Sequence, residues 1–208
     1  MKQYKLYIFD FDGTLVDSYP TMLDIFGSAF KTIGQDCTSD EVMHYMRGSL
    51  IACISERGLN DSQSNLFVGA IMAGLANKEF NKKTKVYFDV VDVLDRLVAK
   101  GAKNAIVSGN NVSHIVEVLK NNNMMDYFDC LVGSDTCKVP KPNPDPIYKV
   151  LDMFKDIDPK DACYVGDSIH DYECALNAGI DGYLLDRNNE YANVNAPKIS
   201  TLWDLLTL

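Results

Sequence analysis

The chain has 208 residues, 47% of them hydrophobic, and carries a formal net charge of -9 at pH 7. This composition predicts a soluble globular protein with a substantial core, built as one domain or as a core with a smaller insertion. The negative charge argues against nucleic-acid binding, and no apolar run approaches the roughly 18 residues of a membrane span, so we expect a cytoplasmic protein with neither kind of partner. Six cysteines without a C-x-x-C pair indicate reduced, mostly buried thiols.

The first expected element is a buried strand over Leu6–Phe9, followed directly by an acidic run that begins at Asp10. From about residue 18 to residue 80 the pattern is helical, with almost no strand signal. Pro20 is tolerated in a first helical turn, and Gly34 is a natural end for the helix that starts there. We therefore expect a small helical bundle inserted after the first strand.

Beyond the bundle, short apolar segments alternate with stretches of helical periodicity. The expected strands are 105–107, 130–132 and 162–165. Short, fully apolar strands separated by helices indicate a parallel sheet that is covered on both faces. The predicted fold is an α/β, doubly wound, Rossmann-like core at residues 1–16 and 82–208, with a helical cap domain at residues 17–81.

Polar side chains follow each predicted strand at its carboxyl end, where ligands bind in such sheets. Asp10 and Asp12 follow the first strand and, at positions i and i+2 of an extended chain, they point to the same side. The polar residues after the second, third and fourth strands are Ser108, Gly109 and Asn110; Lys138 and Lys141; and Asp167 and Asp171. We expect the four strand ends to meet in one site.

This set of groups supports phosphoryl transfer, which needs an in-line nucleophile and neutralisation of the charge on the phosphoryl oxygens. Two neighbouring carboxylates repel each other unless a cation shares them, and Mg²⁺ prefers such oxygen ligands. We expect Asp10 to be the nucleophile that forms an aspartyl phosphate, and Asp12 to act as general acid and then general base. The predicted metal ligands are Asp10, Asp12 and Asp167, with a backbone carbonyl.

The remaining polar groups have supporting roles in this hypothesis. Asp171, one helical turn after Asp167, is expected to orient a lysine or a metal-bound water. Ser108 and the backbone N–H groups after it, from Gly109 onward, are expected to hold the phosphoryl oxygens. Lys138 and Lys141 both compete for the role of the neutralising lysine. His170 is a weaker candidate for a base or ligand, because the metal site favours oxygen donors.

The chain resembles the haloacid dehalogenase-like hydrolase superfamily of aspartate-nucleophile phosphatases. The resemblance covers the whole chain in the right order, and it is carried by Asp10-Phe11-Asp12-Gly13-Thr14, Ser108, Lys141-Pro142-Asn143-Pro144 and Gly166-Asp167-Ser168-Ile169-His170-Asp171. It implies that Lys141, rather than Lys138, is the catalytic lysine. The helical insertion is similar to the cap of phosphoglycolate phosphatases and β-phosphoglucomutases, and Arg47, in a turn of that cap, is the implied substrate contact.

The predicted function is therefore that of a Mg²⁺-dependent phosphatase acting on a small phosphorylated metabolite, such as phosphoglycolate or a sugar phosphate. A phosphotransferase of the β-phosphoglucomutase kind shares every core residue and stays open as an alternative. A regulatory protein on the same fold is a third interpretation, against which the complete set of acids argues. The sequence leaves the oligomeric state open.

Overall fold

The computed structural model describes residues 2–47, 50–77, 83–137 and 139–207, apart from the side chain of Arg47. The chain forms two compact units. One consists of Met1–Val16 together with Val86–Leu208, and the other of Asp17–Lys85. The two connecting segments, β2 (Val16–Asp17) and β3 (Lys85–Val86), pair with each other as a separate two-stranded sheet.

The larger unit is built on a six-stranded sheet with the order β5-β4-β1-β6-β7-β8, in which all neighbouring strands are parallel. Its strands are β1 (Leu6–Phe9), β4 (Lys103–Val107), β5 (Cys130–Val132), β6 (Ala162–Gly166), β7 (Asp181–Leu185) and β8 (Lys198–Ile199). After β1 the chain adds strands first on one side and then on the other, which confirms the predicted doubly wound α/β core. Such a reversal of strand order places a crevice at the carboxyl ends of the central strands.

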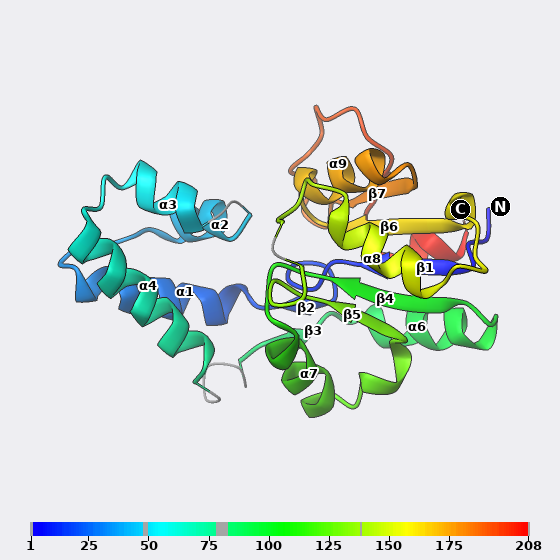
Figure 1. The fold of residues 1–208 in the computed structure, drawn as a ribbon, viewed down its shortest axis with the longest axis horizontal. Helices are drawn as coiled ribbons and strands as arrows, with labels where there is room; N and C mark the ends of the chain where they lie inside the picture. Colours follow the sequence, from blue (N-terminus) through cyan, green and yellow to red (C-terminus); the bar gives the residue numbers. More distant parts are fainter. Residues whose placement is uncertain (1, 48–49, 78–82, 138, 208) are drawn as a thin grey trace. The chain divides into compact units, whose positions relative to one another are not determined.

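Helices cover both faces of this sheet (Figure 1). Alternate residues of β1 point to opposite faces, as a strand requires: Tyr7 and Phe9 pack in the core under α6 and α7, while Leu6 and Ile8 pack in the core under α8 and α9. The helical segments are α6 (Val90–Ala99), α7 (Val112–Asn121), α8 (Asp145–Met153) and α9 (Ile169–Ala178), with the 3₁₀ turns η1 (Met125–Tyr127), η2 (Pro159–Asp161) and η3 (Leu202–Leu206). The central strands are therefore almost wholly apolar.

Two strands of the sheet, β7 and β8, were not predicted. Strand β7 begins with Asp181 and Gly182, two residue types that are depleted in strands. Gly182 is needed there because a Cβ would lie 2.9 Å from both the Ala175 methyl carbon and the Tyr172 ring on α9. Strand β8 has only two residues, too few to show periodicity.

The smaller unit is a bundle of helices, as expected: α1 (Tyr19–Thr32), α2 (Ser39–Arg47), α3 (Leu50–Glu56) and α4 (Asp61–Leu75). Its core is rich in aromatic rings, with Phe30 and Phe67 at a centroid distance of 4.6 Å. Helices α1 and α4 pack closely, since a Cβ on Gly74 would lie 2.8 Å from the Ile25 side chain. Asn60 and Gln63 form a capping box that starts α4.

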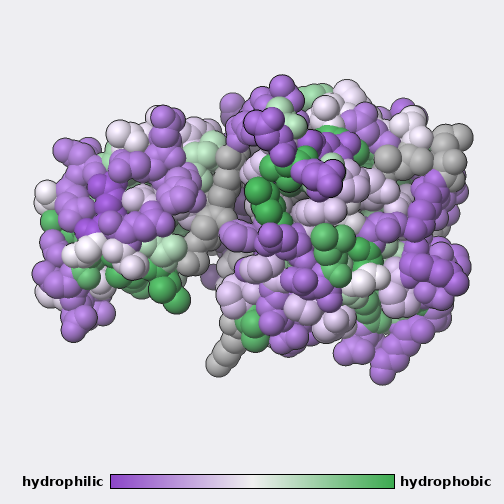
Figure 2. Space-filling model, turned by 90° about the horizontal axis from the view of Figure 1, so that it is seen from above, coloured by the Kyte–Doolittle hydropathy of each residue, from purple (hydrophilic) through white to green (hydrophobic). Residues whose placement is uncertain are grey.

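The face shown in Figure 2 is largely hydrophilic, with hydrophobic residues in small separate patches. Exposed large apolar side chains include Ile51 on α3 and Phe88 just before α6. Over the described ranges, no helix is both long enough and apolar enough to cross a bilayer.

Candidate active site

Three polar side chains follow three neighbouring strands of the sheet. Asp10 follows β1, Ser108 follows β4 and Asp167 follows β6, and β1 lies between the other two strands. The backbone continues the ladder past each strand end, because Asp10 N–H donates to the Val165 carbonyl at 2.8 Å and Ser108 N–H donates to the Val132 carbonyl at 3.0 Å. The three side chains are therefore delivered to the same edge of the sheet, as predicted from the apolar runs.

Carboxylate oxygens of Asp10, Asp167 and Asp171 all lie within 4.8 Å of one another. Two glycines make this approach possible. A Cβ on Gly13, whose φ is +77°, would lie 2.3 Å from Asp167 Oδ2, and a Cβ on Gly166 would lie 2.3 Å from Asp171 Cγ. A cluster of carboxylate oxygens is the donor set that Mg²⁺ prefers.

Lys141 faces two of the three carboxylates. Its Nζ donates to Asp10 Oδ1 at 2.8 Å and to Asp171 Oδ1 at 2.5 Å. Burial alone would lower the pKa of Lys141, but the charges of the two aspartates raise it well above its usual value. The cluster thus holds three carboxylates, and only two of them contact the ammonium group, so a divalent cation would neutralise the remaining negative charge. The residues present therefore fit a metal ion.

Asp10 and Asp171 are both buried, yet their surroundings affect them differently. For Asp10, burial raises the pKa well above its usual value, opposed by Lys141 and reinforced by the charges of Asp171 and Asp167. For Asp171, burial also acts to raise the pKa, but the Lys141 charge and three hydrogen-bond donors lower it overall. A cation shared by the cluster would favour the ionised form of Asp10 that nucleophilic attack requires.

Asp171 is fixed by its own helix. Its Oδ2 accepts from Ser168 Oγ at 2.6 Å and from Ser168 N–H at 3.0 Å, and its own N–H donates to Ser168 Oγ at 3.2 Å. This is the capping box at the start of α9. The same residues that begin the helix thus hold the Asp171 carboxylate toward Lys141.

Tyr164 belongs to the site, although sequence reasoning treated it only as part of an apolar strand. Lys141 Nζ lies 3.1 Å from its hydroxyl oxygen, and the hydroxyl lies 2.9 Å from Asp171 Oδ1 and 3.1 Å from the Val107 carbonyl oxygen. A signal was present, because a tyrosine hydroxyl in a buried strand needs a hydrogen-bond partner.

Asp12 and Ser108 are joined through Asn110. The Asn110 side-chain amide donates to the Asp12 carboxylate, and its backbone N–H donates to Ser108 Oγ at 3.1 Å. The carboxylate cluster described above does not include Asp12. Gly109, between Ser108 and Asn110, is exposed, and a Cβ there would meet nothing within 4 Å, so its backbone is open to a ligand.

The first N–H groups of α7 have partners within the protein. Val112 N–H donates to Asp135 Oδ1 at 2.9 Å, and His114 N–H donates to Asn111 Oδ1 at 2.8 Å. Asn111 is thus the N-cap of the helix. Sequence reasoning expected such amides to hold phosphoryl oxygens, and it did not anticipate the acceptor from the loop after β5.

Three sequence-predicted candidates remain. His170 on α9 is about half exposed, with its Nδ1 3.7 Å from Glu173 Oε2, and it is outside the carboxylate cluster. Lys138 lies outside the described residues. Arg47 ends α2, and its side chain lies outside the described part of the chain.

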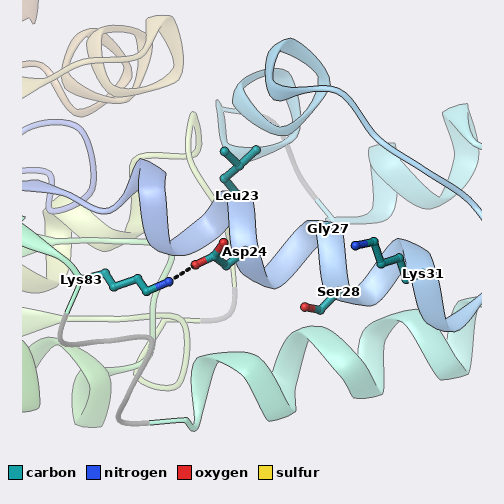
Figure 3. A pocket seen from close by; sticks show the side chains of 6 residues that line it. All are labelled: Leu23, Asp24, Gly27, Ser28, Lys31 and Lys83. Carbon is teal, nitrogen blue, oxygen red and sulfur yellow. Dashed lines mark hydrogen bonds and ion pairs between the residues drawn. The ribbon is translucent and has the colours of Figure 1, made fainter.

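The helical unit has an open hollow along α1 (Figure 3). Asp24 and Lys83, which both line this hollow, form an ion pair. The residues that line the hollow are Leu23, Asp24, Gly27, Ser28, Lys31 and Lys83. This set contains a single carboxylate, so it does not reproduce the metal-ligating cluster of the other unit.

The family model for haloacid dehalogenase-like hydrolases matches residues 7–184. The chain belongs to the haloacid dehalogenase-like hydrolase family. The match runs from β1 into β7 and includes every residue of the cluster around Asp10. This confirms the family resemblance on which Lys141 was preferred to Lys138, while the roles of the individual residues stay predictions.

Two sequence relatives and one solved structure are similar to this chain over most of its length. The phosphoglycolate phosphatase of Aquifex aeolicus is 31% identical over 176 residues, covering 84% of this chain and 81% of that protein. A protein of Caldanaerobacter subterraneus, provisionally named a pyrophosphatase, is 30% identical and covers 83% of this chain and 77% of its own length. A crystal structure from Bacteroides fragilis, described as a haloacid dehalogenase-like hydrolase, superposes with a TM-score of 0.88 at 26% identity, covering 98% of this chain and 100% of the other.

Proposed function

We propose that the protein is a Mg²⁺-dependent phosphatase that hydrolyses a small phosphorylated metabolite through an aspartyl-phosphate intermediate. The observation that carries this proposal is the cluster of Asp10, Asp167 and Asp171, in which Asp10 and Asp171 both contact Lys141. Family membership supports the hydrolytic reaction, and the names of relatives support a phosphate ester as the substrate.

In the proposed first step, a carboxylate oxygen of Asp10 attacks phosphorus and the bond to the leaving oxygen breaks. Asp12 donates a proton to that oxygen. Lys141, held against Asp10, balances negative charge that builds up on the phosphoryl group. In this proposal, Ser108 and the exposed backbone at Gly109 donate hydrogen bonds to the phosphoryl oxygens.

In the second step, water attacks phosphorus while Asp12 accepts a proton, and the bond between phosphorus and the Asp10 oxygen breaks. This releases inorganic phosphate and restores the carboxylate. Asp10 and Asp167, with Asp12 as predicted from the sequence, would hold the metal, and the clustered Asp171 would orient Lys141. When bound, the cation supplies charge neutralisation at the phosphoryl group.

The substrate is proposed from the relatives. The name of the Aquifex aeolicus relative supports phosphoglycolate or a similarly small phosphate ester, and the provisional name of the second relative adds pyrophosphate as a compound to test. The net charge of -9 is consistent with a small-molecule substrate rather than a nucleic acid.

The test is phosphate release from para-nitrophenyl phosphate, phosphoglycolate, pyrophosphate and hexose phosphates, with and without Mg²⁺. We expect Mg²⁺-dependent release that Asp10→Asn abolishes. The matched control is Asp181→Asn at the amino end of β7, where Asp181 pairs with the exposed Lys2, and it should retain wild-type rates. Hexose 1-phosphate isomerisation faster than phosphate release would favour a phosphotransferase, and full activity of Asp10→Asn would refute the nucleophile.

A further inference from the structure

We propose that Arg187 is a positioning residue which, together with Asp89, holds the loop of residues 12–16 in its working conformation. This loop carries Asp12, so the expected effect on rate rests on the proposed function, whereas the anchoring of the loop rests on geometry alone.

The Arg187 guanidinium forms a bidentate ion pair with Asp89. Its Nη1 donates to Asp89 Oδ2 at 2.8 Å and its Nη2 donates to Asp89 Oδ1 at 3.0 Å. The same Nη2 donates to the Thr14 carbonyl oxygen at 3.1 Å, and the guanidinium carbon lies 4.2 Å from the centre of the Tyr87 ring. A planar guanidinium bound in this way has a fixed orientation. The Thr14 carbonyl is therefore held at a defined place.

The ion pair is buried. Asp89 is completely inaccessible to solvent, and the Arg187 side chain is 12% exposed. Asp89 Oδ2 also accepts from Leu202 N–H at 2.8 Å, so the carboxylate joins the start of α6 to η3. Buried ion pairs are often no more stabilising than apolar residues of similar size, so a role in fixing a specific geometry is the better explanation for this one.

Thr14 links the Arg187 contact to the active site. Its carbonyl accepts from Arg187, and its hydroxyl donates to Asp167 Oδ1 at 3.4 Å. Within the loop, Gly13 N–H donates to the Val16 carbonyl at 2.8 Å, and Leu15 N–H donates to the Phe11 carbonyl at 2.9 Å. A displacement of Thr14 would therefore move both the turn that carries Asp12 and a partner of the Asp167 carboxylate.

Sequence motifs do not account for this arrangement. Arg187 lies beyond residues 7–184, which the family model matches, and it stands 98 positions from Asp89 in the chain. The two residues meet because β7 ends at Leu185, two residues before Arg187, and Asp89 directly precedes α6. Arg187 is thus placed beside the catalytic loop by the sheet topology.

The experiment compares two variants. Arg187→Met keeps an unbranched side chain but removes the charge, and Arg187→Lys keeps the charge but loses the bidentate geometry. Amide hydrogen exchange of Leu15 and Val16 is measured, along with kcat on para-nitrophenyl phosphate at saturating Mg²⁺. Two controls match the perturbation. Arg96→Met breaks an exposed ion pair on α6, and Val150→Ala destabilises the core on the other face of the sheet, whereas Leu15 and Val16 belong to the core under α6 and α7.

We expect exchange at Leu15 and Val16 to become at least tenfold faster in Arg187→Met, and kcat to fall by about ten- to a hundredfold, with KM little changed. Arg187→Lys should recover part of both losses, and neither control should show them. The proposal would be overturned if Leu15 and Val16 of Arg187→Met exchanged at the wild-type rate. It would also be overturned if they exchanged faster while kcat stayed at the wild-type value. If the wild type hydrolyses none of the phosphate esters, the proposed function fails, and the exchange measurement still decides whether Arg187 holds the loop.

Discussion

Adding a single methyl group at Gly13 should reduce the activity far more than the stability of the fold. Gly13 follows Asp12 in the catalytic loop, and its φ of +77° lies in the left-handed region. An added Cβ would lie 2.3 Å from Asp167 Oδ2 and 2.5 Å from Asp167 Cγ. Gly13→Ala therefore adds both backbone strain and a collision with a predicted metal ligand.

The two effects have different sizes. A left-handed alanine costs roughly 1–2 kcal/mol of folding free energy. Relief of the collision requires the Asp167 carboxylate to move by about 1 Å, because carbon atoms pack comfortably only at about 3.5 Å or more. A displacement of about 1 Å in an active site can reduce the rate by about 100-fold. We therefore expect a modest loss of stability and a large loss of activity.

Gly101→Ala is the matched control. Gly101 has a φ of +78° in the same structural unit, and a Cβ there would meet nothing within 4 Å. Both variants should lose about 1–2 kcal/mol in urea unfolding. Only Gly13→Ala should lose about 100-fold in kcat on para-nitrophenyl phosphate and require more Mg²⁺ for half-maximal rate. Equal kinetics in the two variants would refute the claim that Asp167 is confined by Gly13.

Other predictions concern the lysine, the metal and the thiols. Lys141→Met should lose at least about 100-fold in kcat and roughly 3–5 kcal/mol of stability, because two buried carboxylates lose their cation. Urea unfolding should show no such loss of stability for Lys103→Met, which breaks an exposed ion pair. Removal of divalent cations with EDTA should stop phosphate release and added Mg²⁺ should restore it, and release that persists in EDTA would contradict the metal assignment. Burial raises the pKa of Cys53 to about 11 and that of Cys174 to about 12, so at about pH 8 both thiols are protonated and should resist a disulfide reagent until urea is added.

The parts of the site that were predictable are those that a local pattern places. Asp10, Ser108 and Asp167 each follow an apolar run, and the parallel sheet brings such positions to one edge. The bounds of β5 were predicted too, because a short apolar run stands out from its neighbours in the sequence.

The parts that were missed depend on contacts between distant segments. Tyr164 sits in a run of apolar residues, and only the folded sheet shows that its hydroxyl reaches Lys141. The contact between Asn110 and Asp12 spans 98 positions, as does the pair of Arg187 with Asp89. No periodicity or spacing encodes such pairings, because they are set by the order of strands in the sheet.

The most direct test of the central claim is to trap the intermediate on Asp10. The enzyme is quenched with borohydride during turnover of para-nitrophenyl phosphate, which reduces an acyl phosphate to an alcohol, and the digested protein is examined by mass spectrometry. The account predicts homoserine at position 10, only when substrate and Mg²⁺ are both present. Steady phosphate release with an unmodified Asp10, or homoserine at another aspartate, would contradict it.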